Sequence, residues 1–236
     1  MDIIQVKDTI YQTNPTYSGS ESKIYQQDEI LYKIFKTNNN TILKNKIRKL
    51  EILYSLAIED ITPLFLIEIN NQIKGYATKN IIGATPLDVF QGNAKEKLQI
   101  LKQILLKLNI LHQHNIVFGD ISTNNILVKN GTVYFCDYDN YKVENYYFDQ
   151  TNYLEKIYLQ ELEGDSYLDN YMFNLLTIAY LEKIFEPYTL NYLRNYTLPN
   201  ILNTKENKEI AYEMLSLKYP EKITPFIEHT KRYHLF

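Results

Sequence analysis

The sequence of 236 residues has one cysteine, no tryptophan and no long uncharged apolar segment. A single cysteine excludes an internal disulfide, and one cysteine with four histidines offers no zinc-type ligand spacing, as is typical of a reducing compartment. No apolar run approaches the ~18–20 residues of a membrane helix, and the first residues lack the basic region and apolar stretch of a signal peptide. We therefore expect a cytoplasmic protein without a membrane partner.

Charge of one sign is not in large excess either. The 25 Lys and Arg residues against 28 Asp and Glu residues give a formal net charge of -3, which provides no general attraction to nucleic acid. Hydrophobic residues make up 45% of the chain, enough to bury a substantial core in one or two domains. This composition excludes the disordered and fibrous classes and predicts no nucleic-acid partner.

The first eighty residues contain mainly strand-forming segments. Residues 24–25 and 30–35 flank a short polar turn, and residues 64–69 and 73–78 flank another, so each pair predicts a β-hairpin. Between the hairpins, apolar residues recur at three- and four-residue steps over 41–56, which predicts an amphipathic helix.

The rest of the chain is mainly helical in pattern. A leucine and isoleucine stripe over 98–111 predicts one helix, and the almost entirely apolar segment 171–185 predicts a buried core helix. We expect an α+β protein with a small β-rich lobe over 1–80 and a helical lobe over 81–236. A hinge near residues 79–83 would join them.

Oxygen-bearing side chains gather around a third predicted hairpin. Asp120 and Asn125 lie five residues apart in a polar loop between a helix and an apolar strand. After a turn at residues 130–131, the next strand ends at Asp137. Hard cations such as Mg²⁺ prefer carboxylate and amide oxygens, and a further carboxylate can orient a nucleophile. These residues therefore predict magnesium-assisted chemistry.

In this order of motifs the chain resembles the protein-kinase-like superfamily, in particular small bacterial eukaryotic-like Ser/Thr protein kinases. That pattern has a catalytic-loop Asp, an Asn five residues later, a metal-binding Asp after the next strand and a strand lysine upstream. Asp120, Asn125 and Asp137 match the first three, and Lys33 matches the strand lysine.

Two further segments extend the resemblance over residues 17 to 181. Gly19, with Ser20 and Ser22, stands just before the strand lysine and is similar to the family's phosphate loop. Asp169 opens a segment that resembles the Asp-led central helix of the large lobe. The resemblance implies a two-lobed fold with one main helix in the small β-rich N-lobe and a shortened helical C-lobe.

The resemblance also implies ATP and Mg²⁺ as cofactors and a role for each matching residue. Lys33 would hold the α- and β-phosphates, and Asp120 would accept or orient the substrate hydroxyl. Asn125 and Asp137 would hold magnesium. Glu51, the acid on the predicted helix, is the expected partner of Lys33.

The position of the adenine in the family implies an apolar pocket. Its expected lining is Ile24 and Leu31 above, Leu127 below, Thr78 as gatekeeper, and the backbones of Lys79 and Ile81. Together with Gly19, Ser20, Ser22 and Lys33 these residues form the predicted nucleotide site.

Several departures from the family pattern leave the acceptor open. Phe118 and Gly119 replace the His-Arg pair before the catalytic Asp, and Ser122 stands where protein kinases place a lysine. No Ala-Pro-Glu segment occurs over 141–168. Asp139 is expected either to bind a second metal or to end the strand. The expected activity is phosphoryl transfer to a hydroxyl, with Ser or Thr of a protein preferred. The open alternatives are a small-molecule kinase of the aminoglycoside or choline type and a nucleotide-binding pseudokinase scaffold.

Overall fold

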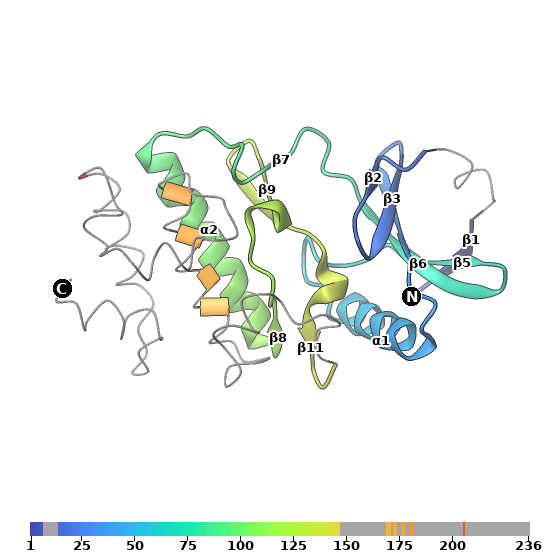
Figure 1. Ribbon diagram of the computed structural model, residues 1–236. Coiled ribbons are helices and arrows are strands. Elements are labelled where there is room, and N and C mark those ends of the chain that lie inside the picture. The colour runs from blue at the N-terminus through green and yellow to red at the C-terminus, as the bar shows by residue number, and fades with distance from the viewer. Residues whose placement is uncertain are drawn as a thin grey trace. The chain divides into compact units, whose positions relative to one another are not determined.

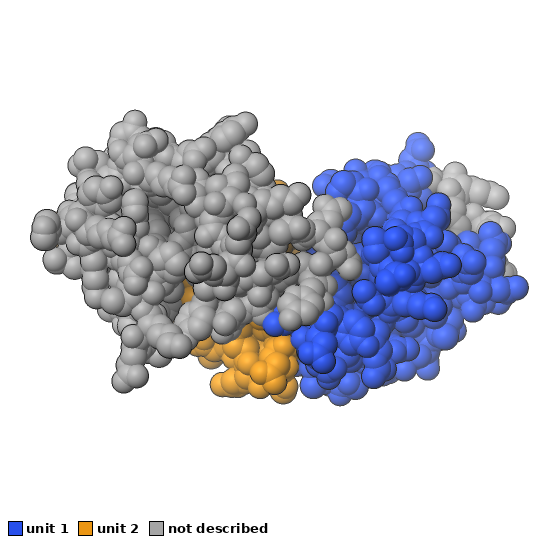
Figure 2. All heavy atoms as spheres, turned by 60° about the horizontal axis from the view of Figure 1, so that its bottom comes forward, with its two compact units in different colours: residues 1–83, 137–149 blue, residues 84–136, 150–236 orange. Residues whose placement is uncertain are grey.

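The protein is α+β, as the sequence predicts (Figure 1). The computed structural model describes residues 1–6, 14–146, 169–170, 172–173, 176–177, 180–181 and 205. The chain forms two compact units, coloured in Figure 2: residues 1–83 with 137–149, and residues 84–136 with 150–236. The segment after Asp137 therefore groups with the first unit, whereas the sequence analysis assigned it to the second.

The first unit contains a six-stranded sheet in the order β1-β5-β6-β4-β3-β2 (Figure 1). Its strands are β1 (Ile3–Gln5), β2 (Tyr17–Ser18), β3 (Ser22–Gln27), β4 (Ile30–Phe35), β5 (Phe65–Ile69) and β6 (Gln72–Lys79). The β3–β4 and β5–β6 pairs confirm the two predicted hairpins. Asn70 and Asn71 both have positive φ, +50° and +60°, which a type I′ turn requires and asparagine tolerates.

Helix α1 (Asn40–Leu56) confirms the predicted amphipathic helix and contacts β6. The side chain of Asn39 caps its start by accepting from the backbone N–H of Thr41 at 2.9 Å. Its end is at Ala57, which adopts the left-handed conformation. Leu50 and Leu53 on its inner face are fully buried, so this face supplies much of the core of the first unit.

The second unit is organised around helix α2 (Ala94–Gln113), which packs on β8 (Ile116–Val117) and β10 (Thr132–Phe135). Asn93 and Glu96 form a capping box at its start, which satisfies two backbone donors. A three-stranded sheet has the order β10-β9-β7, with β9 at Ile126–Lys129 and β7 at Thr85–Pro86.

Short elements complete the described structure. They are the 3-10 helices η2 (Thr123–Asn125) and η3 (Tyr138–Asn140) and the strand β11 (Lys142–Val143). Both η3 and β11 contact α1, which explains why the segment after Asp137 belongs to the first unit. The described residues from Asp169 to Leu181 are helical, while the rest of the predicted helix over 171–185 lies outside the described residues. None of the helices in the described part is long and apolar enough to cross a membrane.

Candidate functional site

Five residues predicted to surround a nucleotide lie on one face of the six-stranded sheet. Residues paired directly across neighbouring strands share a face, and alternate residues along a strand return to it. The register pairs Ile24 with Lys33 and Leu31 with Thr78. Ser22 lies two residues before Ile24 on β3 and so shares this face. The strand lysine thus stands among the side chains predicted for the phosphate loop, the adenine pocket and the gatekeeper.

The predicted phosphate loop is a tight turn between β2 and β3. The N–H of Gly19 donates to the carbonyl of Ser22 at 3.0 Å, which closes the turn. The ammonium group of Lys36 donates to the carbonyl of Gly19. Ser20, at the tip of the loop, is exposed. The predicted contact of this loop with phosphate stays a prediction.

The other predicted pocket residues lie at element ends. Lys79 is the last residue of β6, and Ile81 is half-buried two residues later. Leu127 belongs to the second unit, where β9 pairs it with Tyr134 of β10. Their contacts with adenine likewise stay predictions.

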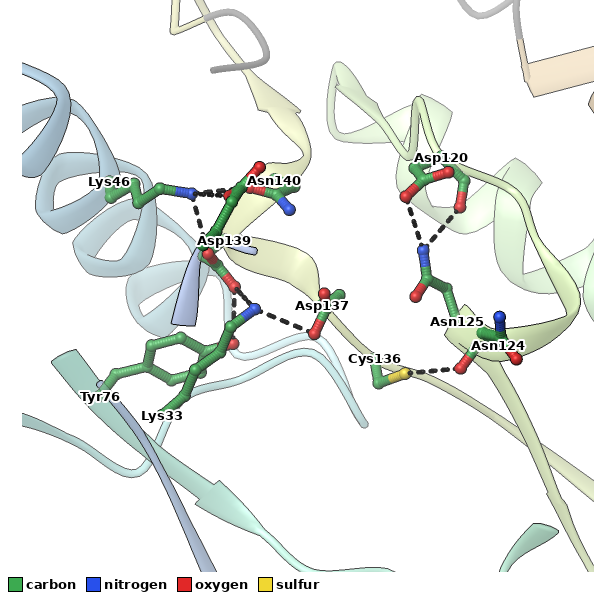
Figure 3. Close-up of polar contacts among 11 residues, drawn as sticks. Lys33, Lys46, Tyr76, Asp120, Asn124, Asn125, Cys136, Asp137, Asp139 and Asn140 are labelled. Carbon is green, nitrogen blue, oxygen red and sulfur yellow. Dashed lines mark hydrogen bonds and ion pairs between the residues drawn. The ribbon is translucent and has the colours of Figure 1, made fainter. Parts of the chain in front are cut away.

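Lys33 belongs to a buried ion-pair cluster in the first unit (Figure 3). Its ammonium nitrogen lies 2.9 Å from Asp137 and 2.6 Å from Asp139, residues more than a hundred positions later in the chain. Burial by itself would lower the pKa of Lys33, but Asp139 and then Asp137 outweigh it and raise the pKa above its usual value. The strand lysine therefore stays charged and has a fixed direction.

Gly75 allows the strand that carries Lys33 to lie against β6. A β-carbon added at Gly75 would lie 2.0 Å from the carbonyl oxygen of Lys33, far inside contact distance. Ile67 pairs with Gly75, and the register shifts at the next residue, so a bulge accompanies this close approach. Any side chain at Gly75 would displace the backbone of Lys33.

The Asp137 side chain is more exposed than that of Asp139, although both accept a hydrogen bond from Lys33. The Asp137 side chain is 40% exposed and uses Oδ1 for the lysine. Its backbone adopts the left-handed conformation, with φ of +60°, which Asp and Asn adopt more readily than other residues with a side chain. An exposed carboxylate beside a buried ammonium can accept a metal ion, so the structure is compatible with the metal role predicted for Asp137.

Asp139, by contrast, is enclosed, with a side chain only 1% exposed. Its Oδ1 accepts from Lys33 and from the Tyr76 hydroxyl at 2.9 Å, and its Oδ2 accepts from Lys46 at 3.0 Å. Burial by itself would raise the pKa of Asp139, but the two lysines hold it well below its usual range. Both oxygens accept from ammonium or phenol donors, so Asp139 is an ion-pair partner in this structure, and its predicted metal role stays a prediction.

Glu51 does not pair with Lys33 in the structure, so the predicted pair of these two residues is wrong. It lies on the exposed face of α1 and pairs with Arg48 at 3.2 Å, three residues earlier. The α1 residue that reaches the cluster is Lys46, which is 3% exposed and bonds to Asp139. The sequence did contain a signal for this: Lys46 lies three residues after Leu43 and four before Leu50, within the apolar stripe of the helix.

The predicted catalytic loop belongs to the second unit. The Asn125 side-chain nitrogen donates both to the backbone carbonyl of Asp120, at 3.0 Å, and to its carboxylate, at 2.9 Å (Figure 3). These bonds direct the Asn125 side-chain oxygen away from Asp120. The N–H of Cys136, the residue before Asp137, donates to the Asn125 carbonyl at 3.1 Å. Two hydrogen bonds thus hold Asp120 and Asn125 together.

Asp169 holds the backbone that leads into this loop. Its carboxylate is fully buried and accepts from the N–H groups of Phe118 at 2.8 Å and Gly119 at 2.7 Å. It also pairs with the ring of His112 on α2 at 2.8 Å. Gly119 has φ of +74°, a conformation that favours glycine. A buried carboxylate with several donors therefore fixes the chain just before Asp120.

The chain matches no protein-family model. It is similar to the KEOPS complex subunit Bud32 of Pyrococcus abyssi (strain GE5 / Orsay), with 27% identity over 73 residues. The aligned part covers 31% of this chain and 30% of that relative, so it spans less than a third of either protein. Bud32 is an atypical protein-kinase-like protein, so the similarity supports the kinase-like superfamily but not the bacterial Ser/Thr kinase type. The α+β architecture is compatible with a small kinase-like fold.

Proposed function

We propose that the protein is an ATP- and Mg²⁺-dependent phosphotransferase that moves the γ-phosphate to a hydroxyl group, with Ser or Thr of a protein as the acceptor. The observation that carries the proposal is the 2.9 Å pair between Lys33 and Asp137. These are the residues expected to meet the phosphates and the metal, and they come from segments 104 positions apart. The limited similarity to Bud32 supports the kinase-like part of the proposal.

The donor chemistry fits magnesium and ATP. Asp137 offers an exposed carboxylate, and Asn125 offers a side-chain oxygen that its bonds to Asp120 do not use. Such oxygens are preferred ligands of Mg²⁺, and Lys33 supplies a fixed positive charge for phosphate oxygens. When bound, MgATP supplies the phosphoryl group and the metal neutralises its developing charge.

Asp120 takes the role of the group that orients the acceptor hydroxyl and accepts its proton. Its carboxylate is half-buried and is held on one side by the Asn125 amide. A carboxylate fixed in this way presents its acceptor sites in a constant direction, which is the requirement for positioning a nucleophile. Asp169 supports this position by holding the preceding backbone.

Incubation with γ-labelled ATP, Mg²⁺ and generic protein acceptors tests the proposal. Asp120→Asn and Asp137→Asn keep side-chain size and should each lower transfer on the order of 10²-fold or more. Asp28→Asn, at the exposed turn between β3 and β4, is the matched control and should transfer at the unsubstituted rate. Equal transfer by Asp120→Asn and the control would refute the assignment.

A small-molecule acceptor is the second candidate. Ser122 favours it, because this half-buried serine stands where protein kinases have a lysine that contacts the transferred phosphate. Labelled product from a panel of amino alcohols, with none on protein, would select this acceptor class. Magnesium-dependent thermal stabilisation by ATP without turnover would instead indicate a nucleotide-binding scaffold, since binding alone raises stability.

A further inference from the structure

The lysine on α1 replaces an acid that kinase-like enzymes use. In the family pattern the strand lysine pairs with a glutamate on the helix. Here the helix contributes Lys46, and the acid comes from Asp139, two residues after the predicted metal ligand Asp137. The helix therefore contributes a cation and the segment after Asp137 contributes the acid, while Lys33 keeps a buried carboxylate partner.

We propose that Asp139, held by Lys46, is the positioning residue that orients Lys33 for phosphate binding. The proposal rests on the proposed phosphotransferase function and adds two residues that the family pattern does not contain. Neither Asp139 nor Lys46 touches the reacting groups. Both act through Lys33.

Three donors determine the orientation of the Asp139 carboxylate. Lys33 and the Tyr76 hydroxyl share Oδ1, and Lys46 takes Oδ2, so rotation about the side-chain bond would break at least one buried bond (Figure 3). Tyr76 lies directly opposite Lys33 in the β4–β6 register, which places the hydroxyl and the ammonium on the same face. A carboxylate fixed by the sheet and the helix can hold Lys33 in one direction.

Lys46 connects this carboxylate to the surrounding elements. It also donates to Asn140 at 2.7 Å and to Glu21, next to the phosphate loop, at 3.3 Å. Its ammonium lies 5.3 Å from the centre of the Phe35 ring. The position of α1 is thus coupled to Lys33 through a chain of two ion pairs, rather than through a direct pair.

The two aspartates that pair with Lys33 differ in exposure. Asp137 is 40% exposed and can turn to a metal ion, whereas Asp139 is 1% exposed and remains with the lysine. If Asp137 bound a metal ion in place of Lys33, the bond from Lys33 to Asp139 would still fix the direction of the ammonium group. The second carboxylate therefore gives Lys33 a partner that does not depend on Asp137.

The first test measures labelling of individual lysines by an amine-reactive acylating reagent, quantified by mass spectrometry. The neutral amine reacts, so a fall of one pKa unit at Lys33 raises its labelling about tenfold. Asp139→Asn and Lys46→Met should raise labelling of Lys33 by about this factor or more. The control Lys44→Met removes an exposed lysine of the same helix and should leave Lys33 unchanged.

Lys49 separates a local effect from unfolding. It is fully buried on α1, so a variant that simply unfolds would label Lys49 as strongly as Lys33. Faster labelling of Lys33 with Lys49 still protected supports the positioning role. Unchanged labelling of Lys33 in both folded variants, Asp139→Asn and Lys46→Met, would overturn it.

The second test moves the acid from position 139 to position 46 on the helix and measures kcat and KM for ATP. Lys46→Glu places a third acid in the cluster with Asp137 and Asp139, and Asp139→Gly leaves Lys33 and Lys46 without their shared acid, so each should lower kcat/KM. The double variant pairs Lys33 with an acid on the helix. Its kcat/KM should be about three- to hundredfold higher than that of the poorer single variant, the range of coupling between neighbouring residues. A double variant no better than the product of the single effects would overturn the proposal.

The two proposals fail separately. Absence of phosphoryl transfer by the unsubstituted protein would refute the proposed function, but the labelling pattern would still decide whether Asp139 and Lys46 hold Lys33. Transfer at the unsubstituted rate by Asp139→Asn, in spite of faster Lys33 labelling, would leave the enzyme intact and refute the positioning role.

Discussion

Replacing Asp139 by Asn should destabilise the protein strongly, because it removes the charge between two buried ammonium groups. The side chains of Lys33 and Lys46 are 5% and 3% exposed, so neither can be solvated without local opening. Removing one partner of a buried ion pair costs about 3–5 kcal/mol. Asp137 cannot replace the lost charge, since it bonds only to Lys33 in this cluster and is partly exposed.

The expected loss is large relative to the whole stability of a domain. The free energy of unfolding of natural domains is about 5–15 kcal/mol, so the cost of about 3–5 kcal/mol for Asp139→Asn is at least about a fifth of it. Lys46→Met should cost less, because Asp139 keeps Lys33 as a counter-charge and the methionine stem fills the same space. The order of the two losses therefore tests whether Asp139 is the centre of the cluster.

The pH dependence gives a second signature of the same residue. The two lysines hold the pKa of Asp139 below that of the unfolded chain, which is about 3.9. Its contribution to the free energy of unfolding is therefore complete above that pKa and is lost as the pH falls toward the folded value. Asn does not titrate, so the difference between the protein and Asp139→Asn should be constant from about pH 5 to 8 and shrink below about pH 4.

Urea unfolding followed by circular dichroism measures both effects. The free energy of unfolding would be determined at several pH values for the unsubstituted protein, Asp139→Asn, Lys46→Met and the exposed control Asp28→Asn. A loss below about 1 kcal/mol at neutral pH, typical of an exposed pair, would refute the reasoning. A stability difference between the protein and Asp139→Asn that grows as the pH falls would also refute it, because the pH dependence would then have the opposite sign.

Three further predictions concern residues around the cluster and the loop. Gly75→Ala should cost about 3 kcal/mol or more and lower Tm by several degrees in calorimetry, because its β-carbon would collide with the Lys33 backbone. Glu51→Gln should change the urea-unfolding free energy by less than about 0.5 kcal/mol, since its pair with Arg48 is exposed; a loss of several kcal/mol would restore it as a partner of Lys33. Asp169→Asn should lower kcat on the order of 10²-fold with little change in ATP affinity, measured by titration, because the backbone before Asp120 loses its anchor; equal kcat in the two proteins would contradict this.

The predictable part of the fold is the part determined by local sequence. The hairpin turn at Asn70-Asn71 follows from residues that tolerate positive φ, and the ends of α1 follow from Asn39 and its amphipathic stripe. Strand β1 was missed because it pairs in parallel with β5, more than sixty residues later. Strands of two residues, such as β2 and β7, have too short a pattern to recognise.

The candidate site also has a part that the local sequence predicts and a part that it does not. Asp120 and Asn125 were predicted as site residues because they lie in one polar loop with the spacing of the kinase pattern, and the structure bonds them to each other. The predicted partner of Lys33, Glu51, was wrong because the family pattern places that acid on the helix, whereas here the buried acid comes from the segment after β10. Glu51 was the acid available there, but its position on the exposed face of α1 already excluded it from a buried pair.

Lys46 and Asp139 could have been found only as a pair. A lysine within an apolar helical stripe is costly alone, and a buried aspartate in the short helix η3 is costly alone, but each satisfies the other. Two such anomalies of opposite charge therefore indicate that they meet, even when neither fits a known motif. Because Lys46 and Asp139 offset each other's buried charge, a change of charge at one of these positions should require a compensating change at the other.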